Sequence, residues 1–463
     1  MSDLYTNASR REFLKRTAAS AATGIAAPLA LNLSAIGKVA AAEAQDYKAL
    51  VCVFLYGAND HYNTIVPYDL SSHRDYARLR QGLAIDRNSL SGTVMGATSS
   101  GQEFAFSPHL TNVPTLWREN RVATLMNVGP LIQPTSKAQF DNKSVLIPPK
   151  IFSHNDQQSI WQSLAPEGAS NGWGGRFADI FLDDNDEDIF SSVSISGNAL
   201  YLSGRRSAQY TLSSKGSIPL VSQSIQQSVY RSPEVAQAME SLMLGGGNGH
   251  LMAEVLRGTS RRALDANEKL TSALSGFPDI GTSFADDPKN LGAQLRMVAR
   301  MIAARSRLGV KRQVFFVSAG GFDLHDGLIE EHPPLLDAVG GALHDFYRST
   351  EELGVQDQVT SFTASDFGRT LSGNRDGSDH GWGSHHLIVG GAVNGGQFYG
   401  QVPVLADDGP DDVGRGRLLP TTSVEQFAAT LGKWFGASDS ELHDVLPRLS
   451  RFAPTDLGFM RRG

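Results

Sequence analysis

The sequence has only one cysteine, Cys52, and it lies inside an apolar run. A single cysteine cannot form an internal disulfide, so we expect it to pack as a small buried hydrophobe. The chain also lacks an excess of positive charge, because its formal net charge is −7. A basic surface is the usual electrostatic signature of nucleic-acid binding, so we expect no nucleic acid among its partners.

Long apolar runs are also missing. Beyond residue 44 no stretch approaches the length needed to cross a bilayer, so we expect no stable membrane span in the mature chain. The pattern Gly-x-Gly-x-x-Gly does not follow the first predicted strand, and this argues against a dinucleotide-dependent oxidoreductase.

The N-terminal segment has the three parts of an export signal. Arg10 and Arg11 stand together, an Ala-rich and weakly apolar run follows over residues 17–37, and small residues at 40–44 fit a cleavage site. This order indicates a twin-arginine signal peptide over residues 1–44. The alternative, a membrane anchor, is weakened by glycine and proline within the run. We therefore expect the twin-arginine translocase to export the folded chain to the periplasm or the extracellular space.

The mature chain, residues 45–463, alternates short apolar strands with helices. Residues 50–56, 313–318 and 359–364 are rich in apolar and β-branched residues, and glycine or polar residues follow each run. Such runs predict neighbouring central strands of a mostly parallel sheet that is covered by helices on both faces, an α/β fold. Three helical stretches near residues 230–310 indicate a helical insertion or cap on this domain.

Aspartates and histidines collect just after the predicted strands, on segments rich in glycine. The set comprises Asp60, Asp323, His325, Asp366, Asp379 and His380. Because the carboxyl ends of parallel strands meet at one edge of the sheet, we expect these side chains to converge on one cleft. Carboxylates and neutral imidazoles together indicate a divalent metal ion, which can be zinc, magnesium, manganese or calcium. The alternative is that each aspartate only caps its own turn.

Six segments spread over the mature chain carry a family resemblance. They are GANDHYNTIVPYD, FSHNDQQSIW, GGFDLH, TASDFGRT, GSDHGWG and GGAVNGGQFYG. In this order they resemble the domain of unknown function 1501 family, which is grouped with the alkaline phosphatase and sulfatase superfamily. The resemblance implies an alkaline-phosphatase-like fold and metal-dependent hydrolysis of a small phosphate or sulfate ester, although no activity is established for the family itself.

The resemblance also implies roles for single residues. Asp60 takes the place of the first metal carboxylate of the superfamily, and Asp323 with His325 matches the second carboxylate–histidine element. The spacing in the second element is shorter than in the superfamily. A formylglycine sulfatase is excluded, because the Cys-x-Pro-Ser-Arg signature is absent and Cys52 lies in a predicted strand.

The third element of the resemblance has two possible matches. Either Asp366 or the pair of Asp379 and His380 corresponds to the Asp-His pair of the superfamily. His385 corresponds to the last metal histidine, although it comes earlier in the chain than is usual.

A nucleophile is the remaining requirement for ester hydrolysis. Ser153 stands at the start of a predicted helix, where the superfamily places its nucleophilic Ser or Thr, and metal coordination would activate its hydroxyl. The same position also suits a simple N-cap, with Asp156 three residues further on. Arg369 or Arg176 is the candidate that steadies the ester oxygens, unless these arginines make structural ion pairs.

Two functions therefore compete. The first is an exported metal-dependent hydrolase of phosphate or sulfate esters, and it is favoured by the concentration of Asp and His at strand ends. The second is a non-catalytic envelope assembly or secretion partner on the same fold, and it is favoured by the lack of an assured nucleophile.

Overall fold

A computed structural model of the chain describes residues 47–217, 232–245, 251–275 and 279–461. The predicted signal peptide, residues 1–44, lies outside the described residues. Within these ranges no helix is both long enough and apolar enough to cross a membrane.

The described residues form a ten-stranded sheet with β1 (Lys48–Tyr56) near its centre. β1 pairs in parallel with β9 (Arg312–Gly320) on one side and with β10 (Val359–Ser365) on the other. Nearly all side chains of the three strands are buried, which explains why these runs are apolar throughout rather than alternating. The prediction that they are parallel neighbours at the centre of the sheet is confirmed.

Shorter strands extend the sheet on both sides. Beyond β10 lie β13 (Ser384–Gly390), β5 (Val122–Gly129) and β14 (Gln397–Gly400), and β15 (Thr422–Ser423) also pairs with β5. Beyond β9 lie β6 (Ser192–Ser194), β7 (Tyr210–Ser213) and β8 (Gly216–Ser217). β13 is antiparallel to both neighbours and β8 is antiparallel to β7, while the other pairs are parallel.

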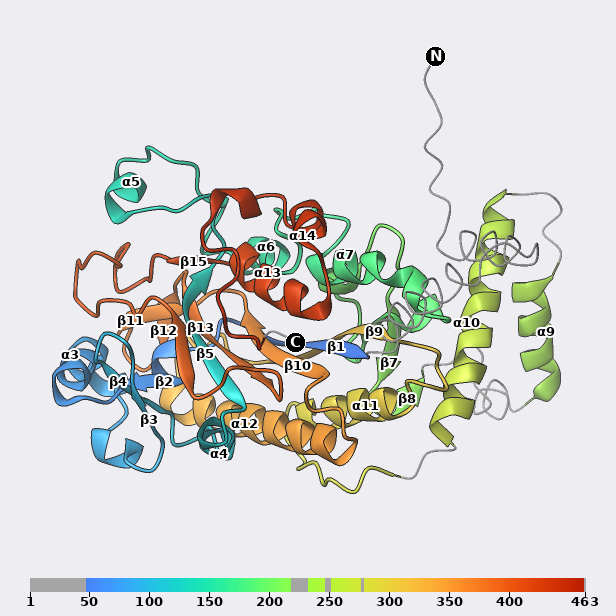
Figure 1. Ribbon diagram of the computed structural model, residues 1–463, viewed down its shortest axis with the longest axis horizontal. Coiled ribbons are helices and arrows are strands. Elements are labelled where there is room, and N and C mark those ends of the chain that lie inside the picture. The colour runs from blue at the N-terminus through green and yellow to red at the C-terminus, as the bar shows by residue number, and fades with distance from the viewer. Residues whose placement is uncertain (1–46, 218–231, 246–250, 276–278, 462–463) are drawn as a thin grey trace, which may run out of the picture. The chain divides into compact units, whose positions relative to one another are not determined.

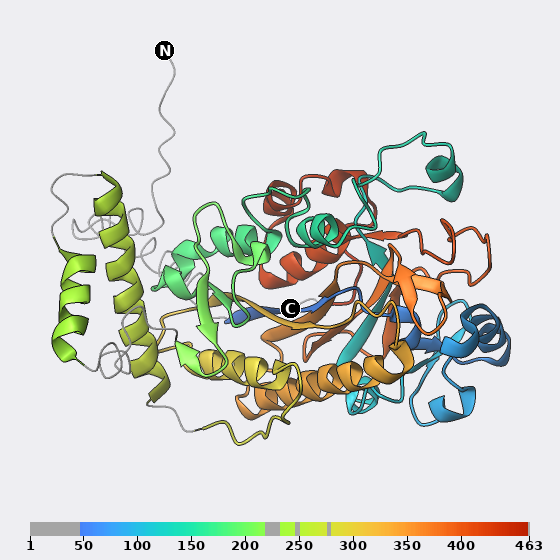
Figure 2. The same ribbon diagram turned by 180° about the vertical axis from the view of Figure 1, so that it is seen from behind.

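Helices cover both faces of this sheet (Figures 1 and 2). One face carries α6 (His154–Ser163), α7 (Trp173–Ile180), α13 (Val424–Phe435) and α14 (Asp439–Val445). The other carries α4 (Val113–Arg118), α11 (Leu291–Ala303) and α12 (Leu328–Glu352). Aromatic side chains such as Trp161, Phe177, Phe362 and Phe427 fill the first interface. The predicted α/β class, with a mostly parallel sheet between helical layers, is confirmed.

The described residues of the region in which we expect a helical insertion form three helices with different neighbours. α9 (Pro233–Leu244) and α10 (Leu251–Ser275) pack against each other, whereas α11 packs on β9 and α12. Buried Leu295 and Val298 anchor α11 there, so this helix forms part of the layer that covers the sheet.

Smaller elements flank the carboxyl edge of the central strands. α3 (Leu70–Arg80) and a three-stranded sheet follow β1, and α5 (Lys137–Asp141) precedes α6. The three strands are β2 (Ile65–Pro67), β3 (Val94–Ala97) and β4 (Glu103–Phe106). The hairpin of β11 (Arg369–Gly373) and β12 (Ser378–His380) follows β10.

The register of the central strands brings their ends together. Tyr56 pairs with Gly320, and Leu55 pairs with Ser365, so β1, β9 and β10 end at the same level. The loops that follow them therefore start side by side, although Tyr56 is far from Gly320 and Ser365 in the sequence. This is the edge at which ligand sites of open α/β sheets form.

Candidate metal centre

The first component of the site is a histidine held by a buried carboxylate. His154 opens helix α6, and its Nδ1 lies 2.5 Å from Oδ2 of Asp366, the residue that follows β10. Asp366 is fully buried and also accepts hydrogen bonds from Nε2 of Gln158 at 2.9 Å and from the backbone N–H of Gly57 at 3.3 Å. The hydrogen bond to Asp366 raises the pKa of His154.

Because a carboxylate only accepts, this contact places the proton of the neutral His154 ring on Nδ1. The lone pair of His154 is then on Nε2, the nitrogen on the other side of the ring. A carboxylate that fixes the tautomer of a histidine in this way is the usual support of a metal-binding imidazole.

His380, the last residue of β12, is fixed in the same tautomer by different means. Its Nδ1 lies 2.8 Å from the carbonyl oxygen of Phe152 and must donate to it, which leaves the lone pair on Nε2. Burial lowers the pKa of His380, which favours this neutral form. Phe152 lies two residues before His154, so the same turn of chain holds both rings.

The two lone-pair nitrogens face each other. Nε2 of His154 lies 3.1 Å from Nε2 of His380. Two lone pairs at this distance repel unless a proton or a cation lies between them. The pair therefore fits a metal ion, since neutral imidazole nitrogens are common ligands of zinc and other divalent ions.

Asp323, in the loop after β9, is a third possible ligand beside His154 and His380. Its Oδ2 lies 3.4 Å from Nε2 of His154, and its Oδ1 lies 3.4 Å from Nε2 of His380. Arg369 donates to Oδ1 of Asp323 at 2.8 Å. Burial acts to raise the pKa of Asp323, but the charges of Arg369 and His154 outweigh it and lower the pKa. Asp323 is thus a carboxylate whose side chain is still 46% exposed.

His325 adds a further imidazole on the exposed side of the site. Its Nε2 lies 2.9 Å from Nε2 of His380 and 3.1 Å from Oδ1 of Asp323. Ligands about 2.0–2.1 Å from a tetrahedral ion lie about 3.3–3.4 Å from each other. The five measured separations among His154, His325, His380 and Asp323 are 2.9–3.4 Å, close to this spacing.

A second group of possible ligands shares one member with the first. Among the described residues, two groups have the geometry to hold an ion, and both contain His380. The first adds His154 and Asp323, and the second adds His325 and Asp379.

The carboxylate of Asp379 is already engaged. Its Oδ2 accepts from Arg415 at 3.0 Å and from Arg417 at 3.3 Å, and its Oδ1 accepts from the backbone N–H of His380 at 2.8 Å. Burial acts to raise the pKa of Asp379, but the hydrogen bond from His380 and the two arginines lower it. Asp379 therefore holds two arginines beside the centre, and the first group is the better candidate for a metal site.

Two glycines allow the loops of the site to approach each other. Gly57 has φ of +109°, and a Cβ on it would lie 2.4 Å from the backbone nitrogen of Asp323. A Cβ on Gly377 would lie 2.1 Å from the carbonyl carbon of His325. A side chain at either position would push a proposed ligand out of place.

Asp60 does not reach this centre, in contrast to the expectation from the sequence. It caps the short 3₁₀ helix His61–Asn63, where its Oδ1 accepts from the backbone N–H groups of Tyr62 and Asn63. Its Oδ2 pairs with the buried Arg80 at 2.6 Å. The charge of Asp60 is therefore balanced by the guanidinium of Arg80, whereas the sequence led us to expect that a metal ion would balance it.

His385 also lies away from the centre. Its ring is buried and packs edge-on against His61 with the centroids 4.8 Å apart. Its Nδ1 accepts a hydrogen bond from the backbone N–H of Asn127 at 3.1 Å. Burial lowers the pKa of His385 to about 4, so the ring is a neutral part of the interior.

Asp366 does lie at the site, but it contacts His154 rather than occupying a position in either group of ligands. Of the residues expected to converge, the structure therefore brings together Asp323, His325, Asp379 and His380, and it places Asp366 directly behind His154.

Arg369 and Arg176 do not present free guanidinium groups to a substrate. Arg369 is fully buried and donates to the carbonyl oxygens of Ala58, Phe322 and Ser378 besides Asp323. Arg176 donates to Val445, Asn171 and Ser163. Both arginines tie loops together, the structural alternative that the sequence left open.

Ser153 occupies the N-cap position of α6, yet its side chain does not cap the helix. Its Oγ donates instead to Oδ2 of the buried Asp156 at 2.9 Å, and Nζ of Lys150 lies 3.2 Å from the same oxygen. The hydroxyl is thus paired with a carboxylate from the first turn of α6, the helix that His154 opens. This is the arrangement of a hydroxyl whose proton can be taken up by a neighbour.

His154 is a candidate metal ligand that sequence reasoning did not assign. The sequence shows it as one of several histidines beside strand ends, in the segment FSHNDQQSIW. The local feature of the sequence that could have indicated its role is Gln158, one helical turn later. This spacing puts both side chains on one face of the helix, and both contact Asp366.

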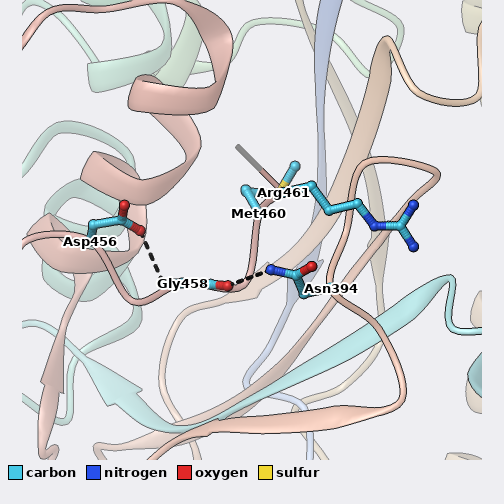
Figure 3. A pocket seen from close by; sticks show the side chains of 5 residues that line it. All are labelled: Asn394, Asp456, Gly458, Met460 and Arg461. Carbon is cyan, nitrogen blue, oxygen red and sulfur yellow. Dashed lines mark hydrogen bonds between the residues drawn. The ribbon is translucent and has the colours of Figure 1, made fainter. Parts of the chain in front are cut away.

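A separate pocket lies at the opposite edge of the sheet. It has a volume of about 380 Å³ and is lined by Asn394, Asp456, Gly458, Met460 and Arg461 (Figure 3). Asn394 follows β13, which runs antiparallel to β10, so it lies near the start of the parallel strands. Asp456 and Asn394 are engaged by hydrogen bonds to the backbone of Gly458. The residues that line this pocket include no histidine. We therefore place the candidate site at His154, His380 and Asp323.

A family model described as "Protein of unknown function (DUF1501)" matches residues 47–446. The chain belongs to the DUF1501 family. The resemblance that the sequence motifs indicate is thereby confirmed. A comparison with curated proteins finds no match.

Some solved structures have a remote likeness to this chain, and three of them cover 70–93% of it. PsFucS1 sulfatase from Pseudoalteromonas sp. has 10% identity and a TM-score of 0.35, with 93% of this chain and 76% of that chain covered. Lipoteichoic acid synthase LtaP from Listeria monocytogenes has 9% identity and a TM-score of 0.32, with coverage of 86% and 74%. A mutant of alkaline phosphatase PafA has 10% identity and a TM-score of 0.28, with coverage of 70% and 64%.

Proposed function

We propose that this protein is an exported, metal-dependent hydrolase of phosphate or sulfate esters. The observation that carries the proposal is the 3.1 Å separation between Nε2 of His154 and Nε2 of His380. Both rings have their Nδ1 turned to an acceptor, so both lone pairs face one point. A divalent ion at that point removes their repulsion.

The ion would be held by His154, His380 and Asp323, with His325 on the exposed side. Imidazole-rich sites of this size favour zinc over magnesium or calcium, which prefer oxygen ligands. A bound zinc ion would supply a Lewis acid that polarises an ester oxygen. The partial exposure of Asp323 leaves room for a substrate at the same place.

Ser153 is the proposed nucleophile. Its Oγ would form a bond to the phosphorus or sulfur atom while the bond to the leaving alcohol breaks, and Asp156 would accept the hydroxyl proton. The leaving oxygen would take a proton from solvent, and water would later release the acid from Ser153. Lys150 holds the Asp156 carboxylate in place through its contact at 3.2 Å.

Export is part of the same proposal. The paired Arg10 and Arg11, followed by a weakly apolar run, support recognition of the folded chain by the twin-arginine translocase. A protein whose site needs a metal ion benefits from folding before export, because the ion can be chosen in the cytoplasm.

The test is the metal content of the purified exported protein, followed by hydrolysis of 4-nitrophenyl phosphate and 4-nitrophenyl sulfate. We expect about one zinc-type ion per chain and turnover that a chelator abolishes. His154→Ala and His380→Ala should lose the ion, whereas His443→Ala, at an exposed position on α14, should keep it. Ser153→Ala should keep the ion and lower kcat about 10³-fold or more.

The competing function is a non-catalytic envelope or secretion partner. It is favoured by the commitment of Asp60 to Arg80, which removes one expected carboxylate from the site. In that case a proton held between His154 and His380 replaces the ion, and the purified protein contains no metal. Absence of metal in the wild type would therefore replace the hydrolase proposal with this one.

A further inference from the structure

The segment of residues 412–417, here called the arginine loop, is a rigid turn beside the candidate centre. Asp412 is buried, and its Oδ1 accepts from the backbone N–H of Gly414 at 2.7 Å and of Gly416 at 2.8 Å. Its Oδ2 accepts from the backbone N–H of Asp408 at 3.1 Å. The loop is thus built around one carboxylate and has a defined shape.

Arg415 is held in a backbone conformation that non-glycine residues rarely adopt. Its φ is +60°, in the left-handed region. Its carbonyl oxygen accepts from both the Oγ of Ser372 at 2.9 Å and the backbone N–H of Ser372 at 3.3 Å. These two hydrogen bonds hold the backbone of Arg415 in one defined conformation.

Arg417 connects the arginine loop to the metal ligands. Its Nε donates to the carbonyl oxygen of His380 at 2.7 Å, and its guanidinium stacks on Phe152 with 4.6 Å to the ring centroid. Phe152 is the residue whose carbonyl fixes the tautomer of His380. The loop therefore has a fixed place next to the centre.

Both arginines of the loop meet one oxygen of Asp379, and they differ in exposure. Arg415 contacts Oδ2 at 3.0 Å and Arg417 contacts it at 3.3 Å. The side chain of Arg417 is 18% exposed, whereas that of Arg415 is 47% exposed. Within the described part of the chain, the other N–H groups of Arg415 have no protein acceptor, so they are available to a ligand.

The charges around the centre favour a negatively charged ligand. The three carboxylates there, Asp323, Asp366 and Asp379, are matched by three guanidinium groups, those of Arg369, Arg415 and Arg417. A divalent ion added to this balanced set leaves two uncompensated positive charges. An anion that carries two negative charges restores neutrality in a partly desolvated site.

We propose that Arg415 binds the oxyanion of a doubly charged ligand, of which a phosphate monoester is the matching substrate class. This inference rests on the proposed metal centre and deepens it. Asp379 accepts a hydrogen bond from only one nitrogen of Arg415, Nη1, so the other N–H groups of this guanidinium are available. A planar guanidinium presents paired donors that suit a phosphate group. The rigid arginine loop keeps those donors oriented before the ligand arrives.

The experiment measures binding of inorganic phosphate to the metal-loaded, full-length exported protein by titration calorimetry. We expect Arg415→Ala to raise the Kd about tenfold or more, and Arg415→Lys to recover only part of the loss because it keeps one point charge without the paired donors. The matched control is Arg375→Ala, which removes an exposed arginine that also has positive φ, at the tip between β11 and β12. The control should stay within about twofold of the wild type.

Metal content is measured in the same samples. Full metal with an unchanged Kd in Arg415→Ala, an equal loss in Arg375→Ala, or no phosphate binding by the loaded wild type would overturn the role of Arg415 and leave the metal centre intact. A wild type without metal would remove the proposed function, and this inference with it. If the melting temperature shows that Arg415→Ala does not fold, the phosphate affinity of Arg415→Lys tests the proposal instead. Full affinity in Arg415→Lys would contradict recognition of phosphate by the paired donors of Arg415.

Discussion

Arg80 and Asp60 form an ion pair that is closed off from solvent: Nη2 of Arg80 lies 2.6 Å from Oδ2 of Asp60, and their side chains are 0% and 2% exposed. Burial acts to raise the pKa of Asp60, but the charge of Arg80 outweighs it and the pKa is lowered. Arg80 also donates to the carbonyl oxygen of Thr370, so the pair connects α3 to the hairpin that carries His380. Asp60 is thus a structural carboxylate.

Breaking this pair should destabilise the fold without removing metal. Arg80→Met leaves a buried, unpaired carboxylate, and we expect the free energy of unfolding to fall by about 3–5 kcal/mol in urea denaturation. Asp60→Asn should leave the metal content of the folded protein unchanged. Loss of metal from folded Asp60→Asn would mean that Asp60 acts as a ligand after all.

Asp366 should tune the metal affinity through His154. In Asp366→Asn the acceptor for Nδ1 of His154 becomes a neutral amide, which lowers the basicity of Nε2 and loosens the ring. We expect metal affinity, measured by competition with a chelator, to fall about 10–100-fold. Asp326→Asn, at an exposed position of the loop after β9, is the control and should bind as the wild type does. Equal affinities in both variants would rule out the positioning role.

Gly57 should be intolerant of a side chain. Alanine there must adopt φ of +109° and would place Cβ 2.4 Å from the backbone nitrogen of Asp323. We expect Gly57→Ala to destabilise the protein by at least about 1–2 kcal/mol and to weaken metal binding. Gly320→Ala, one strand away and with nothing within 4 Å of its Cβ, should do neither. Thermal unfolding and metal content of the two variants check the comparison.

His332 should make the fold sensitive to acid. Burial lowers its pKa to about 4 from the ordinary 6.5, while Nε2 lies 2.9 Å from Oδ1 of Asn59. Because the pKa is depressed in the folded state, the unfolded chain takes up a proton at a higher pH than the folded chain does. The contribution of neutral His332 to the free energy of unfolding is therefore complete above pH 6.5 and is lost as the pH falls towards 4. The contribution is up to about 3 kcal/mol.

The measurement for His332 is the free energy of unfolding between pH 7 and pH 4. His332→Gln should flatten this profile, although the buried His385 keeps part of the slope. His443→Gln, at an exposed position, should leave the profile as in the wild type. An unchanged slope in His332→Gln would show that its ring is already charged in the folded protein.

Replacement of Arg10 and Arg11 by lysine should stop export. The translocase reads the pair of guanidinium groups, and lysine keeps the charge without the planar donors. We expect the double variant to accumulate as folded precursor in the cytoplasm, measured by fractionation and immunoblotting. Normal amounts of processed protein outside the cytoplasm would contradict the twin-arginine signal.

The amino-acid sequence by itself determined the central strands and the edge of the sheet at which the candidate site lies. The apolar runs that became β1, β9 and β10 are recognisable because strands buried on both faces contain few polar residues. The polar residues that follow them are local features of the sequence as well, and the parallel order of the strands brings their ends to one edge. The sequence predicts Asp323 and His325 at this edge for this reason.

Only the tertiary structure decided which of these side chains meet. Asp60 and Asp323 both follow a central strand, yet Asp60 turns to Arg80 while Asp323 faces His154 and His380. The choice depends on where the compensating arginines lie, and they come from α3, from β11 and from the arginine loop. No local pattern records such a pairing, because the partners are distant in sequence and the energy of each contact depends on the burial of both groups.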